Sequence, residues 1–130
     1  MRAFLAILVA VGMAACSAPS KDAVQAAKPV PTPQRIVTLH SVLTEVVSAL
    51  GLEGHIVGTD VTSKYPDAVN ALPKLGHDKA IRAEGILSLS PDLVMANVGQ
   101  LDPAVESQLR QAGVRLMLST TENSIEGTKQ

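Results

Sequence analysis

Four short apolar stretches rich in β-branched residues alternate with segments whose apolar residues recur at helical spacing. The predicted strands are residues 35–39, 55–59, 92–96 and 114–118. The predicted helices are residues 41–51, 82–89 and 102–113. Strands that alternate with helices indicate an α/β fold, in which a parallel sheet carries helices on both faces.

The first and last predicted helices carry end signals. Ser41 is the expected N-cap of the first helix and Gly51 its expected end, whereas Asp102, Pro103 and Gly113 mark the last helix as N-cap, first helical residue and end. The expected buried face of the first helix consists of Val42, Val46, Ala49 and Leu50. Between the second strand and second helix, prolines predict a loop with one helical turn at residues 66–72.

The N-terminal stretch "MRAFLAILVAVGMAAC" has the features of an export signal. One positive charge at Arg2 precedes an apolar run that is too short to span a bilayer, and two alanines precede Cys16. We therefore expect a lipoprotein signal peptide over residues 1–15, cleavage before Cys16 and lipidation of its sulfur. Cys16 is the only cysteine of the chain, and the alternative is a free or intermolecular thiol. Residues 16–34, rich in alanine and proline, predict an extended tether.

Composition narrows the choice of function. The formal net charge of the chain is −1, aromatic residues make up 2% and tryptophan is absent, which disfavours nucleic-acid binding. The chain contains neither a GxSxG motif nor a glycine loop that cradles phosphate. Catalysis is not expected, and a small α/β hydrolase is the one enzymatic alternative.

Ligands of parallel α/β sheets bind beyond the carboxyl ends of the strands. The loops that begin at His40, Asp60 and Asn97 follow three predicted strands. We therefore expect these loops to share one rim and to hold any ligand site.

Three stretches resemble a known family in the same order along the chain. They are "RIVTLHSVLTEVVSALG", "VGTDVTSKYPDAVNALPKLG" and "AEGILSLSPDLVMA", which are similar to the N-terminal lobe of periplasmic binding proteins for ABC importers of iron compounds and cobalamin. Haem-binding members are the most similar. The resemblance implies an N-terminal α/β lobe over residues 35–123 and the start of an interlobe helix over residues 124–130, with the second lobe absent from this sequence.

The resemblance implies a haem site at His77. Haem-binding members carry a tyrosine after the glycine where this chain has His77, and neutral imidazole is also a common ligand of haem iron. Lys79 stands where those members place an arginine near a propionate, and it supplies charge without the bidentate fork. We expect His77 to be the axial ligand, and the alternative is a solvated loop histidine.

Other residues are secondary candidates. His40 and Tyr65 are expected near the same cleft, while two histidines without a third ligand are a weak signal for a bare metal ion. The resemblance also implies that Glu84 docks onto arginines of the permease, as a glutamate at this place does in the resembled importers, although the helix dipole alone also explains a carboxylate there. The remaining expectations are an exposed His55 and two core methionines, Met95 and Met117.

The predicted function is haem delivery to an ABC importer for iron acquisition, by an exported lipoprotein anchored to a membrane on its periplasmic or extracytoplasmic side. The expected partners are haem as transported ligand, an importer permease and the membrane, without a catalytic cofactor or nucleic acid. A siderophore or cobalamin binder of the same superfamily is the nearest alternative. A haem- or metal-sensing lipoprotein that meets no permease is the alternative from another class.

Overall fold

The computed structural model describes residues 30–120. The expected signal peptide, Cys16, all but the end of the expected tether and the expected start of the interlobe helix lie outside these residues. No helix within residues 30–120 is long and apolar enough to cross a membrane.

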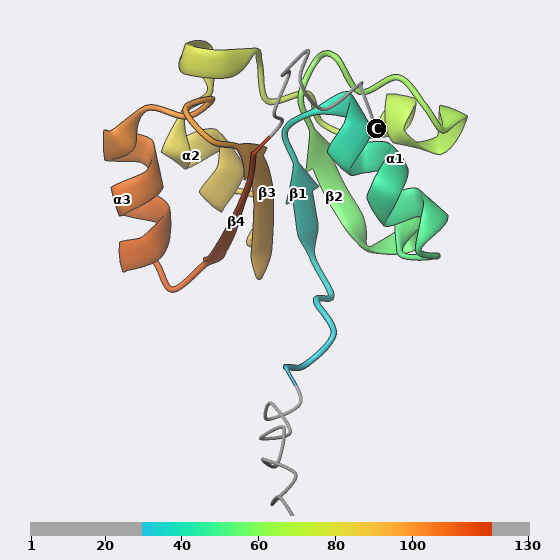
Figure 1. Ribbon diagram of the computed structural model, residues 1–130, viewed down its shortest axis with the longest axis horizontal. Coiled ribbons are helices and arrows are strands. Elements are labelled where there is room, and N and C mark those ends of the chain that lie inside the picture. Colours follow the sequence, from blue (N-terminus) through green and yellow to red (C-terminus); the bar gives the residue numbers. More distant parts are fainter. Residues whose placement is uncertain (1–29, 121–130) are drawn as a thin grey trace, which may run out of the picture. The chain divides into compact units, whose positions relative to one another are not determined.

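A four-stranded parallel sheet forms the centre of the fold, with strand order β2-β1-β3-β4 (Figure 1). Its strands are β1 (Ile36–Thr38), β2 (Ile56–Thr59), β3 (Leu93–Asn97) and β4 (Arg115–Ser119). All four predicted strands are present, shifted or shortened at their ends. The predicted α/β class is confirmed.

Helices cover both faces of the sheet, as Figure 1 shows. The α-helices are α1 (Ser41–Ala49), α2 (Ala83–Leu87) and α3 (Pro103–Gln111). The 3-10 helices are η1 (Glu53–His55), η2 (Asp67–Ala71), which corresponds to the predicted helical turn, and η3 (Asp78–Ala80), which the apolar pattern did not predict. One face carries α1 and η2, and the other carries α2 and α3.

Each face of the sheet has its own apolar core because successive side chains of a strand point to opposite faces. The buried core on the α2–α3 face comprises Val37, Leu39, Ile81, Ala83, Ile86, Val94, Ala96, Leu101, Val105, Leu109 and Val114. The core on the α1 face comprises Ile36, Leu43, Val47, Ile56, Val69 and Met95. Burial of these side chains is the main favourable term in folding.

The buried face of α1 differs from the expected one. Leu43, Thr44 and Val47 are buried, whereas Val42 and Val46 are 57% and 46% exposed and Leu50 is also exposed. The buried stripe is thus one residue out of step with the predicted stripe. Two sets of residues in this helix fit the helical spacing, one with Val42 and Val46 and the other with Leu43 and Val47. The set that packs against the sheet is the one next to Thr44.

Two further predictions about buried residues are wrong. Met117 is 52% exposed because β4 is an edge strand and only the opposite side of it, with Leu116 and Leu118, packs against the α2–α3 core. His55 is half-buried in η1 and not exposed. Met95 is buried in the α1-side core, as expected.

The expected capping of α3 is confirmed, and it predicts a measurable contribution to stability. Asp102 accepts a hydrogen bond from the Ala104 N–H at 2.9 Å, Pro103 is the first helical residue, and Gly113 has a φ of +79° after the helix end. Asp102→Ala should lower the free energy of unfolding by about 1 kcal/mol. Urea denaturation checks this value, with Asp102→Asn as a matched variant that keeps the cap. Equal midpoints for wild type and Asp102→Ala would show that the cap contributes nothing.

Candidate ligand-binding site

The loops after the parallel strands meet at one rim, as the topology predicted. The Asp60 N–H donates to the Thr38 carbonyl at the end of β1, and the Val98 N–H donates to the Ser119 carbonyl at the end of β4. The buried Gln100 side chain donates to the Leu39 carbonyl. These bonds join the ends of all four strands into a single surface.

Beneath the rim, a buried chain of hydroxyl groups fixes the ends of β1 and β2. Thr44 Oγ1 lies 2.7 Å from both Thr38 Oγ1 and Ser63 Oγ, and Ser63 Oγ donates to the Asp60 carboxylate at 2.6 Å. Each of these residues is almost fully buried. Since buried polar groups need partners, this network explains why α1 turns Thr44 inward.

His77 lies on the rim, at the start of η3. The Val61 N–H donates to the carbonyl of Gly76, the residue before His77, and the Lys79 ammonium donates to the Leu101 carbonyl at 3.1 Å. The segment around His77 is thereby bonded to the loops after β2 and β3. Figure 1 shows η3 at the same end of the sheet as the carboxyl ends of the strands.

The His77 ring is oriented by its neighbour. Its Nδ1 lies 3.0 Å from Asp78 Oδ2, and the two side chains are 59% and 53% exposed. A carboxylate oxygen at this distance favours a proton on Nδ1, because two facing lone pairs would repel. The neutral ring then keeps the lone pair of Nε2 free, which is the tautomer that a metal-binding histidine needs.

His40 has the opposite tautomer. It is the N-cap of α1 in place of the expected Ser41, and its Nδ1 accepts a hydrogen bond from the Val42 N–H at 3.3 Å. An accepting Nδ1 carries no proton, so the neutral ring carries it on Nε2. Binding of iron through Nε2 would therefore require loss of the cap, and His40 is suited to donate a hydrogen bond to a ligand at the rim.

Lys79 and Glu84 line one hollow of about 280 Å³ between η3, α2 and α3. Glu84 is exposed in the first turn of α2, and Arg82 and Asp102 border the same hollow. Glu84 forms no ion pair within residues 30–120. Glu84 and Lys79 thus border the same hollow.

Tyr65 is 67% exposed in the loop after β2, before a cis peptide bond to Pro66. Sequence reasoning missed two exposed apolar residues in the rim loops, Val61 (44% exposed) and Val98 (59% exposed). Their positions were the only available signal: Val98 directly follows β3, and Val61 is the second residue after β2. Together these side chains add apolar surface to the rim, which suits a large ligand with an apolar body.

Lys74 is a third residue that sequence reasoning missed. Although the residue as a whole is exposed, its ammonium donates to Thr59 Oγ1 (2.8 Å), the Ser63 carbonyl (2.7 Å) and the Val69 carbonyl (3.0 Å). Desolvation lowers the pKa of Lys74, and the nearby Asp60 carboxylate partly offsets that effect.

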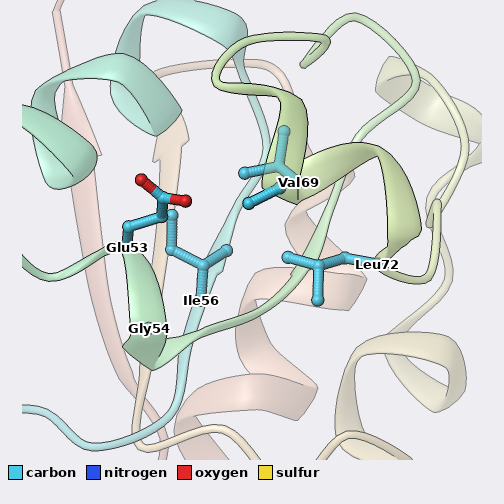
Figure 2. A pocket seen from close by; sticks show the side chains of 6 residues that line it. Glu53, Gly54, Ile56, Val69 and Leu72 are labelled. Atoms are coloured by element: carbon cyan, nitrogen blue, oxygen red, sulfur yellow. The ribbon is translucent and has the colours of Figure 1, made fainter.

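A hollow of about 220 Å³ lies where the start of β2 meets η2 and the residue that follows it. Figure 2 shows Glu53 and the apolar side chains of Ile56, Val69 and Leu72 around it. Glu53 is its one charged residue, so this hollow offers few groups that could orient a ligand. In the described part of the chain, no group of three or more His, Cys, Asp or Glu side chains could hold a bare metal ion.

Comparisons with known proteins give a consistent result. The family model described as periplasmic binding protein matches residues 36–130. An uncharacterized ABC transporter substrate-binding lipoprotein, YvrC, from Bacillus subtilis (strain 168) is 34% identical over 87 residues, which are 65% of this chain and 27% of that protein. A vitamin B12-binding protein from Vibrio campbellii is 35% identical over 95 residues, which are 72% of this chain and 34% of that protein.

A solved structure agrees with these relatives. The crystal structure of a periplasmic haem-binding protein from Pseudomonas aeruginosa is 39% identical, has a TM-score of 0.67, and is matched over 73% of this chain and 34% of that chain. This chain therefore spans about a third or less of the length of the relatives that it matches.

Proposed function

Because the chain belongs to the periplasmic binding protein family, we propose that it serves as part of the substrate-binding component of an ABC importer, and that its substrate is haem. The family expected from the three sequence motifs is thereby confirmed. The matched relatives are named for binding or transport, and the proposal includes no catalytic step.

The observation that carries the haem proposal is the His77–Asp78 pair. Nδ1 of His77 faces a carboxylate oxygen at 3.0 Å and the ring is well exposed on the rim, so Nε2 is available to an iron atom above it. Haem iron needs only one or two protein ligands, since the macrocycle supplies the others. In the proposed site, His40 supplies a hydrogen-bond donor, Tyr65 a further contact, and Lys79 a positive charge for a propionate.

Cobalamin is the second candidate substrate. The vitamin B12-binding protein from Vibrio campbellii is similar to this chain over nearly the same length as the haem-binding structure. Apolar surface at the rim suits either macrocycle, and an imidazole is a ligand for cobalt as well as for iron. The two candidates differ in the metal that His77 would bind, which is iron in haem and cobalt in cobalamin.

Parallel titrations of the chain with ferric haem and with cyanocobalamin test the proposal. We expect haem to give a shifted and saturable Soret band, and cobalamin to give no heat of binding in calorimetry at the same concentrations. Saturable binding of cobalamin without a Soret shift from haem would replace haem by cobalamin as the proposed substrate. If the chain binds neither haem nor cobalamin, both candidate substrates are refuted.

The proposal assigns two further contacts. Cys16 carries the lipid that anchors the exported protein to a membrane, which is consistent with the lipoprotein name of the Bacillus relative. Glu84 docks onto arginines of the permease, since its carboxylate is exposed at the start of α2. A lipoprotein that senses haem without a permease would need the Cys16 anchor but would not need Glu84.

A further inference from the structure

The loop that follows β2 turns back and ends beside the strand from which it starts. The Leu75 N–H donates to the Thr59 carbonyl at 2.8 Å, and the Val61 N–H donates to the Gly76 carbonyl at 3.2 Å. His77 is the next residue after this return. The position of His77 on the rim therefore depends on how the loop is closed.

One side chain joins the end of β2 to two separate parts of this loop. The Lys74 ammonium donates to Thr59 at the end of β2, to the Ser63 carbonyl in the turn that follows, and to the Val69 carbonyl in η2. The three acceptor residues are fully buried. An ammonium group has three N–H donors, and all three are used here.

The ammonium of Lys74 is partly desolvated where it meets these acceptors. Its pKa is lowered mainly by desolvation, which means that the charged ammonium is less favourable here than in water despite the nearby Asp60 carboxylate. An apolar side chain of similar length would avoid this cost but would leave the acceptors of Thr59, Ser63 and Val69 without this donor. A charged group that is retained despite the cost of its desolvation is often found at a functional site.

We propose that Lys74 is a positioning residue of the ligand site, whose ammonium holds the loop of residues 60–76 in the shape that places His77 on the rim. The inference rests on the proposed function, in which His77 binds the iron of haem. Lys74 itself needs no contact with the ligand, because it acts through the backbone that leads into Gly76 and His77.

Lys74→Met tests this inference, with Lys64→Met as the matched control. Lys64 is exposed in the same loop, and its hydrogen bond to Asn70 uses only its backbone carbonyl. In the ligand-free chain, we expect the loop amides of Lys74→Met to exchange hydrogen roughly tenfold faster than those of wild type. We also expect its affinity for ferric haem to fall roughly tenfold while the type of haem spectrum is retained, since His77 is still present.

Urea denaturation and haem titration together separate positioning from a general structural role. Lys74→Met leaves three buried acceptors without this donor and should lower the midpoint. Haem affinity is therefore compared without urea, where wild type and variants are folded: positioning predicts the tenfold loss there, whereas a merely structural role would leave the affinity of the folded chain unchanged. Lys64→Met should resemble wild type in all three measurements. Thr59→Val removes one acceptor of the Lys74 ammonium, so it should also speed loop exchange and lower haem affinity, but by less than Lys74→Met. If Lys74→Met fails to fold, Thr59→Val is compared with wild type in its place.

Unchanged loop exchange in both Lys74→Met and Thr59→Val would overturn the inference, and so would faster exchange with unchanged haem affinity. Loss of haem binding that only matches the fraction of unfolded chain would also overturn it. A wild-type chain that binds no haem would refute the proposed function itself. The wild-type titration shows this before any variant is measured, so the two failures can be told apart.

Discussion

Replacing His77 with alanine is expected to abolish the shifted Soret band of ferric haem and to weaken haem binding by roughly a hundredfold or more. Loss of a residue that only orients a metal-binding side chain typically costs about 10- to 100-fold in metal affinity. Loss of the metal-binding side chain itself should cost at least that much. The ring is exposed, and among residues 30–120 the one polar partner of its Nδ1 is Asp78 at 3.0 Å. Folding should therefore be unaffected, and absorption titrations with circular dichroism check both points.

Three variants show whether the effect belongs to the His77 imidazole. His55→Ala, in η1 before β2, should leave the haem spectrum unchanged. Asp78→Asn removes the charge beside Nδ1 while asparagine tolerates the positive φ of that residue (+43°), and it should weaken binding roughly tenfold. His77→Tyr should give the high-spin spectrum of a phenolate ligand. A wild-type spectrum in His77→Ala, with its loss in His40→Ala or Tyr65→Phe, would transfer the ligand role to that residue.

Replacing Cys16 with serine is expected to move the protein from the membrane fraction almost entirely to the soluble fraction. The serine hydroxyl cannot take the place of the thiol that carries the diacylglycerol, and several acyl chains together are needed for a stable anchor. Membrane flotation and metabolic labelling with a radioactive fatty acid check this result in an export-competent host. Replacement of the nearby Ser17 by alanine is the control and should leave both fractions as in wild type. Label and flotation that persist in Cys16→Ser would exclude this anchor.

The sequence was sufficient to predict strands, helix order and the rim, because these follow from local apolar patterns and from the rules of parallel sheets. The caps of α3 were also predictable, since Asp102, Pro103 and Gly113 act on the backbone within a few residues. The buried face of α1 was not. Thr44 is buried because its hydroxyl meets Thr38 and Ser63, and partners 6 and 19 residues away leave no mark on helical periodicity.

The candidate site shows the same limit. His77 could be selected from a resemblance, but its tautomer depends on the orientation of Asp78 beside it, and the opposite tautomer of His40 depends on its role as an N-cap. Lys74 had no signal in the sequence at all. In "LPKLG" it looks like an ordinary surface lysine, and only the folded loop brings the carbonyls of Ser63 and Val69 to its ammonium.

The central claim is that an imidazole on the rim, that of His77, binds the iron of haem. Resonance Raman spectra of the ferrous haem complex measure the iron–imidazole stretching band directly. The account predicts a band that shifts when the chain is labelled with ¹⁵N-histidine, that persists in His40→Ala, and that disappears in His77→Ala. A haem complex without an isotope-sensitive band, or a band that remains in His77→Ala, would contradict the account.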